Sequence, residues 1–129
     1  MLSKIKKILI ATDFSESSEN ALRVGISVAG RHKADIILLH VIDRFANIQP
    51  SEVFLPEMKL LLDINYMVDH RLREFSESLT KRTGIKIKSV VLDGQPFEQI
   101  CRLSFEEKTS LIVIVTHGIS GLRGLFMGS

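Results

Sequence analysis

The sequence has one cysteine, no long apolar segment and no large excess of either charge. Its only thiol, Cys101, allows no intramolecular disulfide, which agrees with a reducing, cytoplasmic setting. The apolar run at residues 8–11 is too short for a signal peptide or a membrane span. Seventeen basic and fifteen acidic residues leave a formal charge of +2, which favours neither nucleic acid nor a membrane surface as a partner. We therefore expect a cytoplasmic protein, whose 129 residues provide for one domain, 1–129.

The sequence also lacks motifs for catalysis and for metal binding. Ser15, Ser17 and Ser18 have no placed base beside them, and there is neither a Ser-x-Gly elbow nor an evident acid–base pair. The histidines have no metal-ligand spacing with Cys101, so we predict no metal site. Cys101, on the apolar face of a helix, is expected to be buried, and His40, within an apolar strand, to be a hydrogen-bonded core residue. We predict no catalytic residues, and nothing in the sequence argues for an enzyme.

Short apolar runs alternate with amphipathic segments along the chain. The runs lack the polar–apolar alternation of a half-exposed strand, which indicates strands that are buried on both faces. We expect strands at residues 5–12, 34–43, 86–92 and 111–115, and a loop at 43–56. Strands that alternate with helices are typical of a parallel sheet with helices on both faces. The sequence thus predicts an α/β fold around an open parallel sheet.

Three segments between these strands have the spacing and end signals of helices. The first begins after the N-cap Ser15 and runs to about residue 32, with small residues on its inner face. The second covers residues 57–82 and is ended by Gly84. The third begins at Pro96, which suits the first position of a helix. Its core-facing residues are expected to be Phe97, Ile100, Cys101, Ser104 and Phe105.

The end of the chain is rich in glycine. After the strand at 111–115 come Gly118, Gly121, Gly124 and Gly128, and then Ser129. Glycine lets the backbone approach a ligand closely, and a serine caps a helix whose free N–H groups attract phosphate. The composition fits a phosphate-binding loop and equally a flexible surface loop. The Walker A motif is excluded because the segment has no Lys, and the dinucleotide motif because the glycines follow a late strand.

Three segments are expected to meet at one edge of the sheet. Asp13, residues 41–43 and residues 116–129 all follow the carboxyl ends of strands, where open parallel sheets bind ligands. Asp13 either contacts a ribose or adenine group or caps the helix that follows it. His117 lies in the glycine-rich segment, where it could contact a phosphate. The sequence therefore predicts a ligand site at this edge, built from both ends of the chain.

These motifs resemble those of the universal stress protein family. Gly118, the nine residues after it, and Gly128-Ser129 match the family's signature of G-x-x-G, nine residues and G-[ST], although Val115 replaces the first glycine. Similarity extends over essentially the whole chain. The other positions that carry it are the opening Ile8-Leu9-Ile10-Ala11-Thr12-Asp13-Phe14-Ser15, with Ser18 and Ala21 after it, then Leu39-His40-Val41, and Gly94-Gln95-Pro96 with Ile100.

The resemblance implies a Rossmann-like three-layer sandwich with the strand order 3-2-1-4, which the crossover rule also favours. It further implies an ATP-binding regulatory protein of the universal stress response, with at most weak ATP hydrolysis, and Mg only where nucleotide is bound. In the family, Asp13 would lie against the nucleoside and the backbone at Val41 would meet adenine. Implied partners are adenine nucleotide, a second copy in a homodimer, and a regulatory protein. The implied nucleotide-binding residues are Ala11, Thr12, Asp13, Val41, Thr116, His117, Gly118, Gly128 and Ser129.

Two departures from the family pattern change what we expect. The branched side chain of Val115 would crowd a nucleotide, and the family continues beyond Ser129 with a helix and a fifth strand, its usual dimer contact. We therefore expect a sheet without a fifth strand and weak ATP binding. The exposed edge at 111–115 is expected to be covered by a second copy or by the tail at 122–127. The alternative is a degenerate member that binds no nucleotide and acts through protein contacts.

Overall fold

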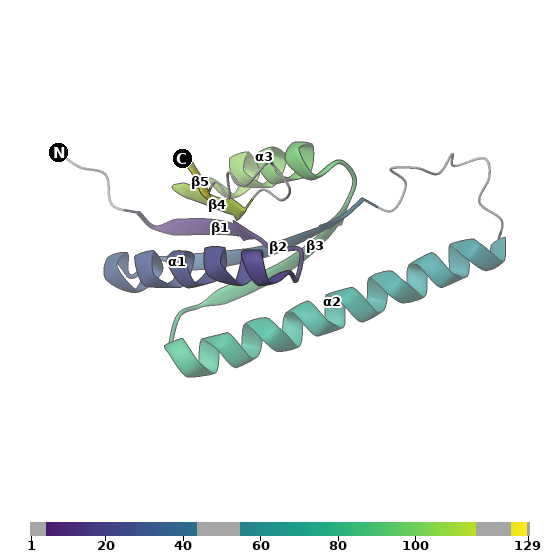
Figure 1. Cartoon of the computed structure of the whole chain (residues 1–129), viewed down its shortest axis with the longest axis horizontal. Helices are drawn as coiled ribbons and strands as arrows, with labels where there is room; N and C mark the ends of the chain where they lie inside the picture. Colours follow the sequence, from purple (N-terminus) through teal and green to yellow (C-terminus); the bar gives the residue numbers. More distant parts are fainter. Residues whose placement is uncertain (1–4, 44–54, 116–124, 129) are drawn as a thin grey trace.

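The computed structural model describes residues 5–43, 55–115 and 125–128. In this part of the chain, three helices cover the two faces of one sheet (Figure 1). The strands are β1 (Lys7–Ala11), β2 (Asp35–Ile42), β3 (Ile87–Asp93), β4 (Leu111–Val115) and β5 (Leu125–Gly128). The helices are α1 (Glu16–His32), α2 (Leu55–Thr83) and α3 (Pro96–Glu107). The expected alternation of strands and helices is confirmed.

The strand order of the sheet is β3-β2-β1-β4-β5. β1 pairs in parallel with β2 on one side and with β4 on the other, and β2 pairs in parallel with β3. Residues of α1 and α2 pack on one face, whereas residues of α3 pack on the other. The predicted strand order 3-2-1-4 and the three-layer α/β architecture are therefore confirmed.

The expectation that a fifth strand is missing is wrong. β5 runs antiparallel along the outer side of β4, with Ile112 opposite Gly128 and Val115 opposite Leu125. An antiparallel return needs only a short connection, whereas a parallel return needs a longer crossover. The pairing gives β4 a hydrogen-bonding neighbour on its outer side, so β4 is not an edge strand. Of the two predicted ways to cover β4, the structure has the chain's own tail, through residues 125–128.

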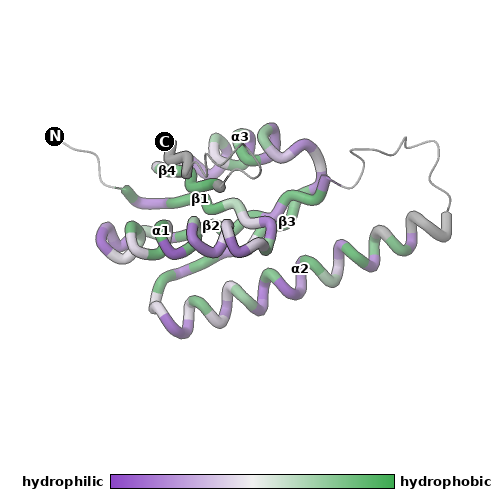
Figure 2. Tube along the Cα trace, viewed as in Figure 1, coloured by the Kyte–Doolittle hydropathy of each residue, from purple (hydrophilic) through white to green (hydrophobic). Residues whose placement is uncertain are grey.

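Alternate residues of β1 are buried against different helices. Ile8 and Ile10 belong to a cluster with residues of α1 and α2, whereas Leu9 belongs to a cluster with Ile100 and Leu103 of α3. The side chains of Ile8, Leu9 and Ile10 are all fully buried, as the uniformly apolar run predicts. Figure 2 shows the apolar residues concentrated in the central strands, with polar residues prominent along the outer parts of the helices. The core is therefore two layers, one on each face of the sheet.

Local signals fix the ends of the helices where the sequence places them. Ser15 is the N-cap of α1, and its side chain accepts a hydrogen bond from the Ser18 N–H. Gly84 follows α2 with a φ of 76°, a left-handed conformation that glycine adopts without a steric penalty. Pro96 is the first residue of α3, and the Gln95 side chain caps that helix by accepting from Glu98 N–H. The cap predictions are therefore confirmed.

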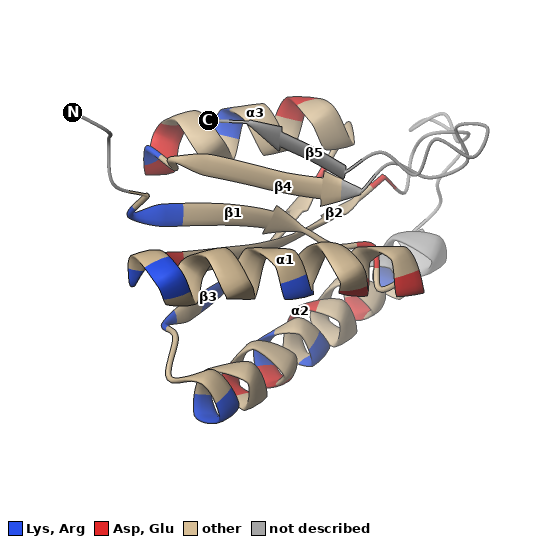
Figure 3. Ribbon diagram, turned by 60° about the vertical axis from the view of Figure 1, so that its left-hand side comes forward, with Lys and Arg blue, Asp and Glu red and all other residues tan. Residues whose placement is uncertain are grey.

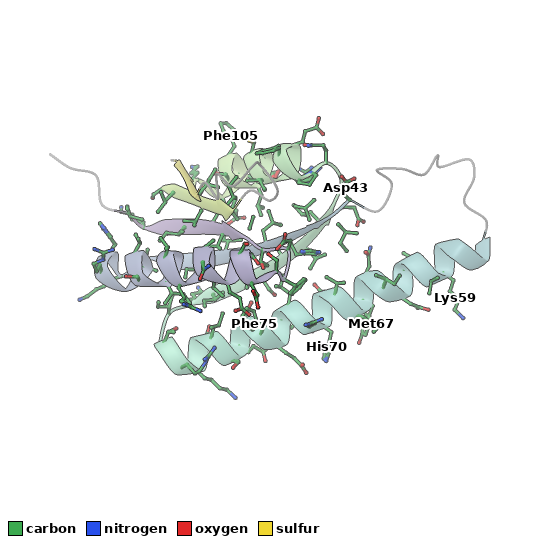
Figure 4. All side chains as sticks on the ribbon, in the orientation of Figure 1. Asp43, Lys59, Met67, His70, Phe75 and Phe105 are labelled. Atoms are coloured by element: carbon green, nitrogen blue, oxygen red, sulfur yellow. The ribbon has the colours of Figure 1, made fainter. Side chains whose placement is uncertain are left out.

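The predicted inner face of α3 is confirmed at Ile100 but wrong at Phe97, Cys101 and Phe105. Ile100 and Leu103 are buried against the sheet, but Cys101 is exposed, and Phe97 and Phe105 keep 58% and 86% of their surface accessible. Figure 4 shows Phe105 on the side of α3 away from the sheet. The helix has two apolar stripes, and the one centred on Ile100 and Leu103 faces the aliphatic side chains of the central strands.

The buried residues of α2 lie in its second half. Leu72 and Leu79 are buried in the same cluster as α1, whereas the first half of the helix extends past the sheet (Figure 1). That first half carries apolar side chains that are 41–73% exposed, namely Leu60, Leu62, Ile64, Tyr66 and Met67. Among the described residues, no helix is both long and apolar enough to cross a membrane.

Candidate functional site

β1 lies at the point where the chain changes direction across the sheet, with β2 on one side and β4 on the other. Ligands of open parallel sheets bind beside the carboxyl ends of the strands at such a point. Ala11 is paired with Leu39, and Thr12 N–H donates to the Leu39 carbonyl at 2.8 Å, so the end of β1 is fastened to β2. The structure thus brings the predicted residues Ala11, Thr12 and Asp13 beside Val41.

The side of this edge that faces α3 has an apolar floor and a polar rim. Ala11 and Val41 are half-buried and pack against the cluster that contains Leu39, and so does Ile114 of β4. Asp13 follows directly and is exposed. Small-molecule sites commonly combine an apolar surface with a few polar groups that orient the ligand. The arrangement suits a flat ring with hydrogen-bonding groups at its margin.

Asp13 has a defined role in the turn between β1 and α1. Its Oδ1 accepts a hydrogen bond from Ser15 N–H at 2.9 Å, while Ser15 itself is the N-cap of α1. Asp13 therefore does not cap α1 itself. It holds Ser15, the residue that does. The carboxylate is held in the turn and is still exposed at the edge of the sheet.

Phe14, next to Asp13, has a left-handed backbone with a φ of 67°. For a residue with a bulky side chain this conformation costs about 1–2 kcal/mol, so the surroundings must hold it. Its N–H donates to Thr12 Oγ1 at 3.0 Å, and its ring contacts two side chains from other elements. The ring centroid is 4.8 Å from that of His40 and 5.2 Å from the Arg71 guanidinium carbon.

Phe14 and Arg71 line a cavity of about 370 Å³ between α1 and α2. Thr12 and Ser18 also line the cavity, and their hydroxyl oxygens are hydrogen-bonded to each other at 3.0 Å. Phe75 of α2 also lines it and lies between the two helices in Figure 4. The sequence reasoning missed Phe14 and Arg71 as parts of this edge. Nothing in the sequence places Arg71 there, because the angle between α2 and the sheet decides it.

His40 is hydrogen-bonded, as predicted, but it is half-buried rather than fully inside the core. Its Nδ1–H donates to the Thr12 carbonyl oxygen at 2.7 Å. A carbonyl oxygen can only accept, so this bond assigns the hydrogen to Nδ1. His40 therefore joins β2 to the turn that carries Asp13.

The other predicted site residues are placed elsewhere or not described. Thr116, His117, Gly118 and Ser129 lie outside the described residues. Gly128 is not at the carboxyl edge, which corrects the sequence prediction of its position. It lies opposite Ile112, three residues before the end of β4 and roughly 10 Å from that end at about 3.3 Å per residue. The antiparallel direction of β5 carries Gly128 away from Asp13.

Acidic residues lie at or just after the carboxyl ends of three neighbouring strands. Asp13, Asp43 and Asp93 are exposed, and Asn65 Nδ2 donates to Asp93 Oδ2 at 3.4 Å. Figure 3 shows further acidic residues at the start of α1, and Figure 4 shows Asp43 at the end of β2. Ionised carboxylates only accept hydrogen bonds, so this edge suits hydroxyl and amino groups better than phosphate. The described residues contain no group of three or more His, Cys, Asp or Glu that could hold a metal ion.

An open, mostly parallel sheet between helical layers, with polar residues at its carboxyl edge, defines an α/β protein of the Rossmann-like class. Within that class, the sequence pattern of the Universal stress protein family matches residues 4–129. The chain belongs to the universal stress protein family.

Several relatives cover most of this chain. Universal stress protein MJ0577 of Methanocaldococcus jannaschii is 30% identical, over 96% of this chain and 84% of its own. Universal stress protein YxiE of Bacillus subtilis is also 30% identical, over 95% of this chain and 86% of its own.

Solved structures give the same fold. UspA from Lactobacillus plantarum superposes with a TM-score of 0.75 at 23% identity, over 95% of this chain and 86% of that one. A universal stress protein in complex with cAMP superposes with a TM-score of 0.64 at 22% identity, over 95% and 81% of the two chains. At identities of 22–23%, the similarity to these two structures shows the fold alone.

Proposed function

We propose that this chain binds an adenine nucleotide at the carboxyl edge of its sheet and acts as a regulatory protein of the stress response, not as a strong catalyst. The observation that carries the proposal is the meeting of Ala11, Asp13 and Val41 at the point where β1 is flanked by β2 and β4. A relative with the same fold was solved with cAMP, which supports adenine as the base.

The geometry favours a division of roles along the ligand. The adenine ring would lie on the half-buried side chains of Ala11 and Val41, with the backbone at Val41 in reach of its edge. Asp13 would accept hydrogen bonds from ribose hydroxyls, which a carboxylate does well. The phosphates would be directed toward Thr116 to Gly118, since the acidic described edge does not suit their negative charge, and any Mg would accompany the phosphates. A cytoplasmic location, a homo-oligomer and a regulatory partner complete the proposal.

Calorimetric titration of the purified protein with adenosine, cAMP and ATP tests this function. Asp13→Asn keeps an oxygen for the Ser15 N–H but removes the charge. Losing one charge-assisted hydrogen bond should weaken adenosine binding roughly tenfold or more. The matched control is Asp35→Asn, an exposed aspartate of β2 at the opposite edge of the sheet, which should leave binding unchanged. No binding of any of the three ligands, or equal effects of both substitutions, would contradict the proposal.

A second candidate is a member that binds no nucleotide and acts through protein contacts. It is favoured by the exposed apolar side chains in the first half of α2, which include Leu62, Tyr66 and Met67. Clustered exposed apolar residues often mark interaction surfaces. The same titrations distinguish the two, because this candidate requires that adenosine, cAMP and ATP all fail to bind.

A further inference from the structure

The residue before Asp13 is fixed to β2 by two hydrogen bonds. Thr12 N–H donates to the Leu39 carbonyl at 2.8 Å, and the Thr12 carbonyl accepts from His40 Nδ1–H at 2.7 Å. Both polar groups of the Thr12 backbone are therefore paired with consecutive residues of β2. The second bond depends on a side chain that is 28 residues away in the sequence.

The residue after Asp13 is held by the same histidine. Phe14 has a φ of 67°, a conformation that persists only where its surroundings stabilise it. The His40 ring is 4.8 Å from the Phe14 ring, and Arg71 of α2 lies within cation–π distance, at 5.2 Å from the Phe14 ring centroid. His40 thus contacts both neighbours of Asp13.

His40 acts from the opposite side of the sheet to the proposed nucleotide. Successive residues of a strand point to opposite faces. Val41 packs with the cluster on the α3 side, whereas His40 contacts Phe14, which lines the cavity between α1 and α2. A ligand that rests on Ala11 and Val41 therefore does not need to touch the imidazole.

We propose that His40 is a positioning residue of the nucleotide site, which orients the Asp13 carboxylate through Thr12 and Phe14, with Arg71 holding Phe14 from α2. This inference rests on the proposed nucleotide-binding function. It assigns to His40 a role beyond filling the core, because the hydrogen bond and the ring contact converge on one turn. The direct effect of His40 is on the turn, and its effect on the ligand passes through Asp13.

Substitutions at His40 separate a positioning role from a packing role. His40→Leu removes the donor and the imidazole ring and should weaken adenosine binding about tenfold, a change of about 1.4 kcal/mol. His40→Asn keeps an N–H donor near the place of Nδ1 and should restore most of the affinity. His40→Gln puts its donor one bond farther from the backbone and should not restore it. If His40 only filled space, the Asn variant would not bind adenosine more tightly than the Gln variant.

A double-mutant cycle tests whether the effect passes through Asp13. If His40 acts by orienting that carboxylate, His40→Leu should weaken adenosine binding no further once Asp13→Asn is present. Amide hydrogen exchange provides a readout without ligand, in which His40→Leu should speed exchange at Phe14 and Ser15, whose N–H groups bond within the turn. His40→Asn should keep both amides protected.

The experiments distinguish a failure of the positioning role of His40 from a failure of the proposed nucleotide-binding function. If wild-type protein binds none of adenosine, cAMP and ATP, the proposed function and this inference are both overturned. If it binds one of them and His40→Leu changes neither that affinity nor amide exchange, only the positioning role is overturned. The same holds if the effect of His40→Leu adds fully to that of Asp13→Asn. Should His40→Leu not fold, equal adenosine affinities of the Asn and Gln variants would overturn it equally well.

Discussion

Gly25 of α1 lies so close to Ile10 of β1 that a Cβ at this glycine would be 2.3 Å from Ile10 Cδ1. Real Cβ atoms do not approach other heavy atoms to this distance. The contact explains why the inner face of α1 consists largely of small residues, since a larger side chain would lift the helix from the sheet. Ile10 is fully buried, so its side chain has little room to move aside.

Gly25→Ala should therefore destabilise the protein, although alanine is the better helix former. Overpacking costs about 1–3 kcal/mol, and the gain in helix propensity offsets about 1 kcal/mol of that. Urea unfolding should show a net loss in the free energy of unfolding. Gly30→Ala in the same helix is the control, because nothing lies within 4 Å of its added Cβ, and it should raise stability by up to about 1 kcal/mol. A Gly25→Ala variant as stable as Gly30→Ala would contradict the close packing.

Ser15→Ala should remove the N-cap of α1. The Ser15 hydroxyl accepts from Ser18 N–H at 3.2 Å, and loss of such a cap costs about 1 kcal/mol. Thermal or urea unfolding measures the change. Ser27→Ala, at an exposed position in the interior of the same helix, should be neutral or slightly stabilising. Equal effects of the two substitutions would show that the Ser15 hydroxyl does not cap the helix.

Leu103→Ala and Phe105→Ala should differ sharply, because α3 presents Leu103 to the sheet and Phe105 to solvent. Leu103 is 9% exposed, so its truncation should cost about 2–4 kcal/mol, whereas Phe105 is 86% exposed and its truncation should change stability by less than about 0.5 kcal/mol. Urea unfolding of the two variants tests the orientation of the helix. A larger loss for Phe105→Ala would reverse the assignment of the two faces.

The strands could be predicted from the sequence because their signal is local, whereas their order was predicted from the family resemblance and the crossover rule. The run at Ile8, Leu9 and Ile10 is apolar on both faces and is buried on both faces. The inner face of α3 could be predicted only at Ile100, because helical spacing allows either the stripe of Phe97, Cys101 and Phe105 or Leu103 to lie on the same face as Ile100. The aliphatic surface of the sheet selects between them, and that surface exists only after folding.

The candidate site likewise has residues that could be predicted from the sequence and residues that could not. Asp13 and Val41 could be placed at one edge because each follows or ends a buried strand, and parallel strands end together. The contact of Phe14 with Arg71 could not be predicted, since it depends on the angle at which α2 crosses the sheet. The position of Gly128 was mispredicted because glycine-rich sequence does not reveal the direction of the strand that it joins.

His40 and Val41 are neighbours that lie on opposite faces of β2. His40 contacts Phe14, which lines the cavity between α1 and α2, and Val41 belongs to the proposed nucleotide site. Thermodynamic linkage then gives a reciprocal consequence. If the proposed roles of Asp13 and His40 hold, a molecule that binds in that cavity and favours the observed placement of Phe14 would raise nucleotide affinity by some factor, and nucleotide would raise the affinity for that molecule by the same factor. In that case a single strand of this sheet would couple two binding events.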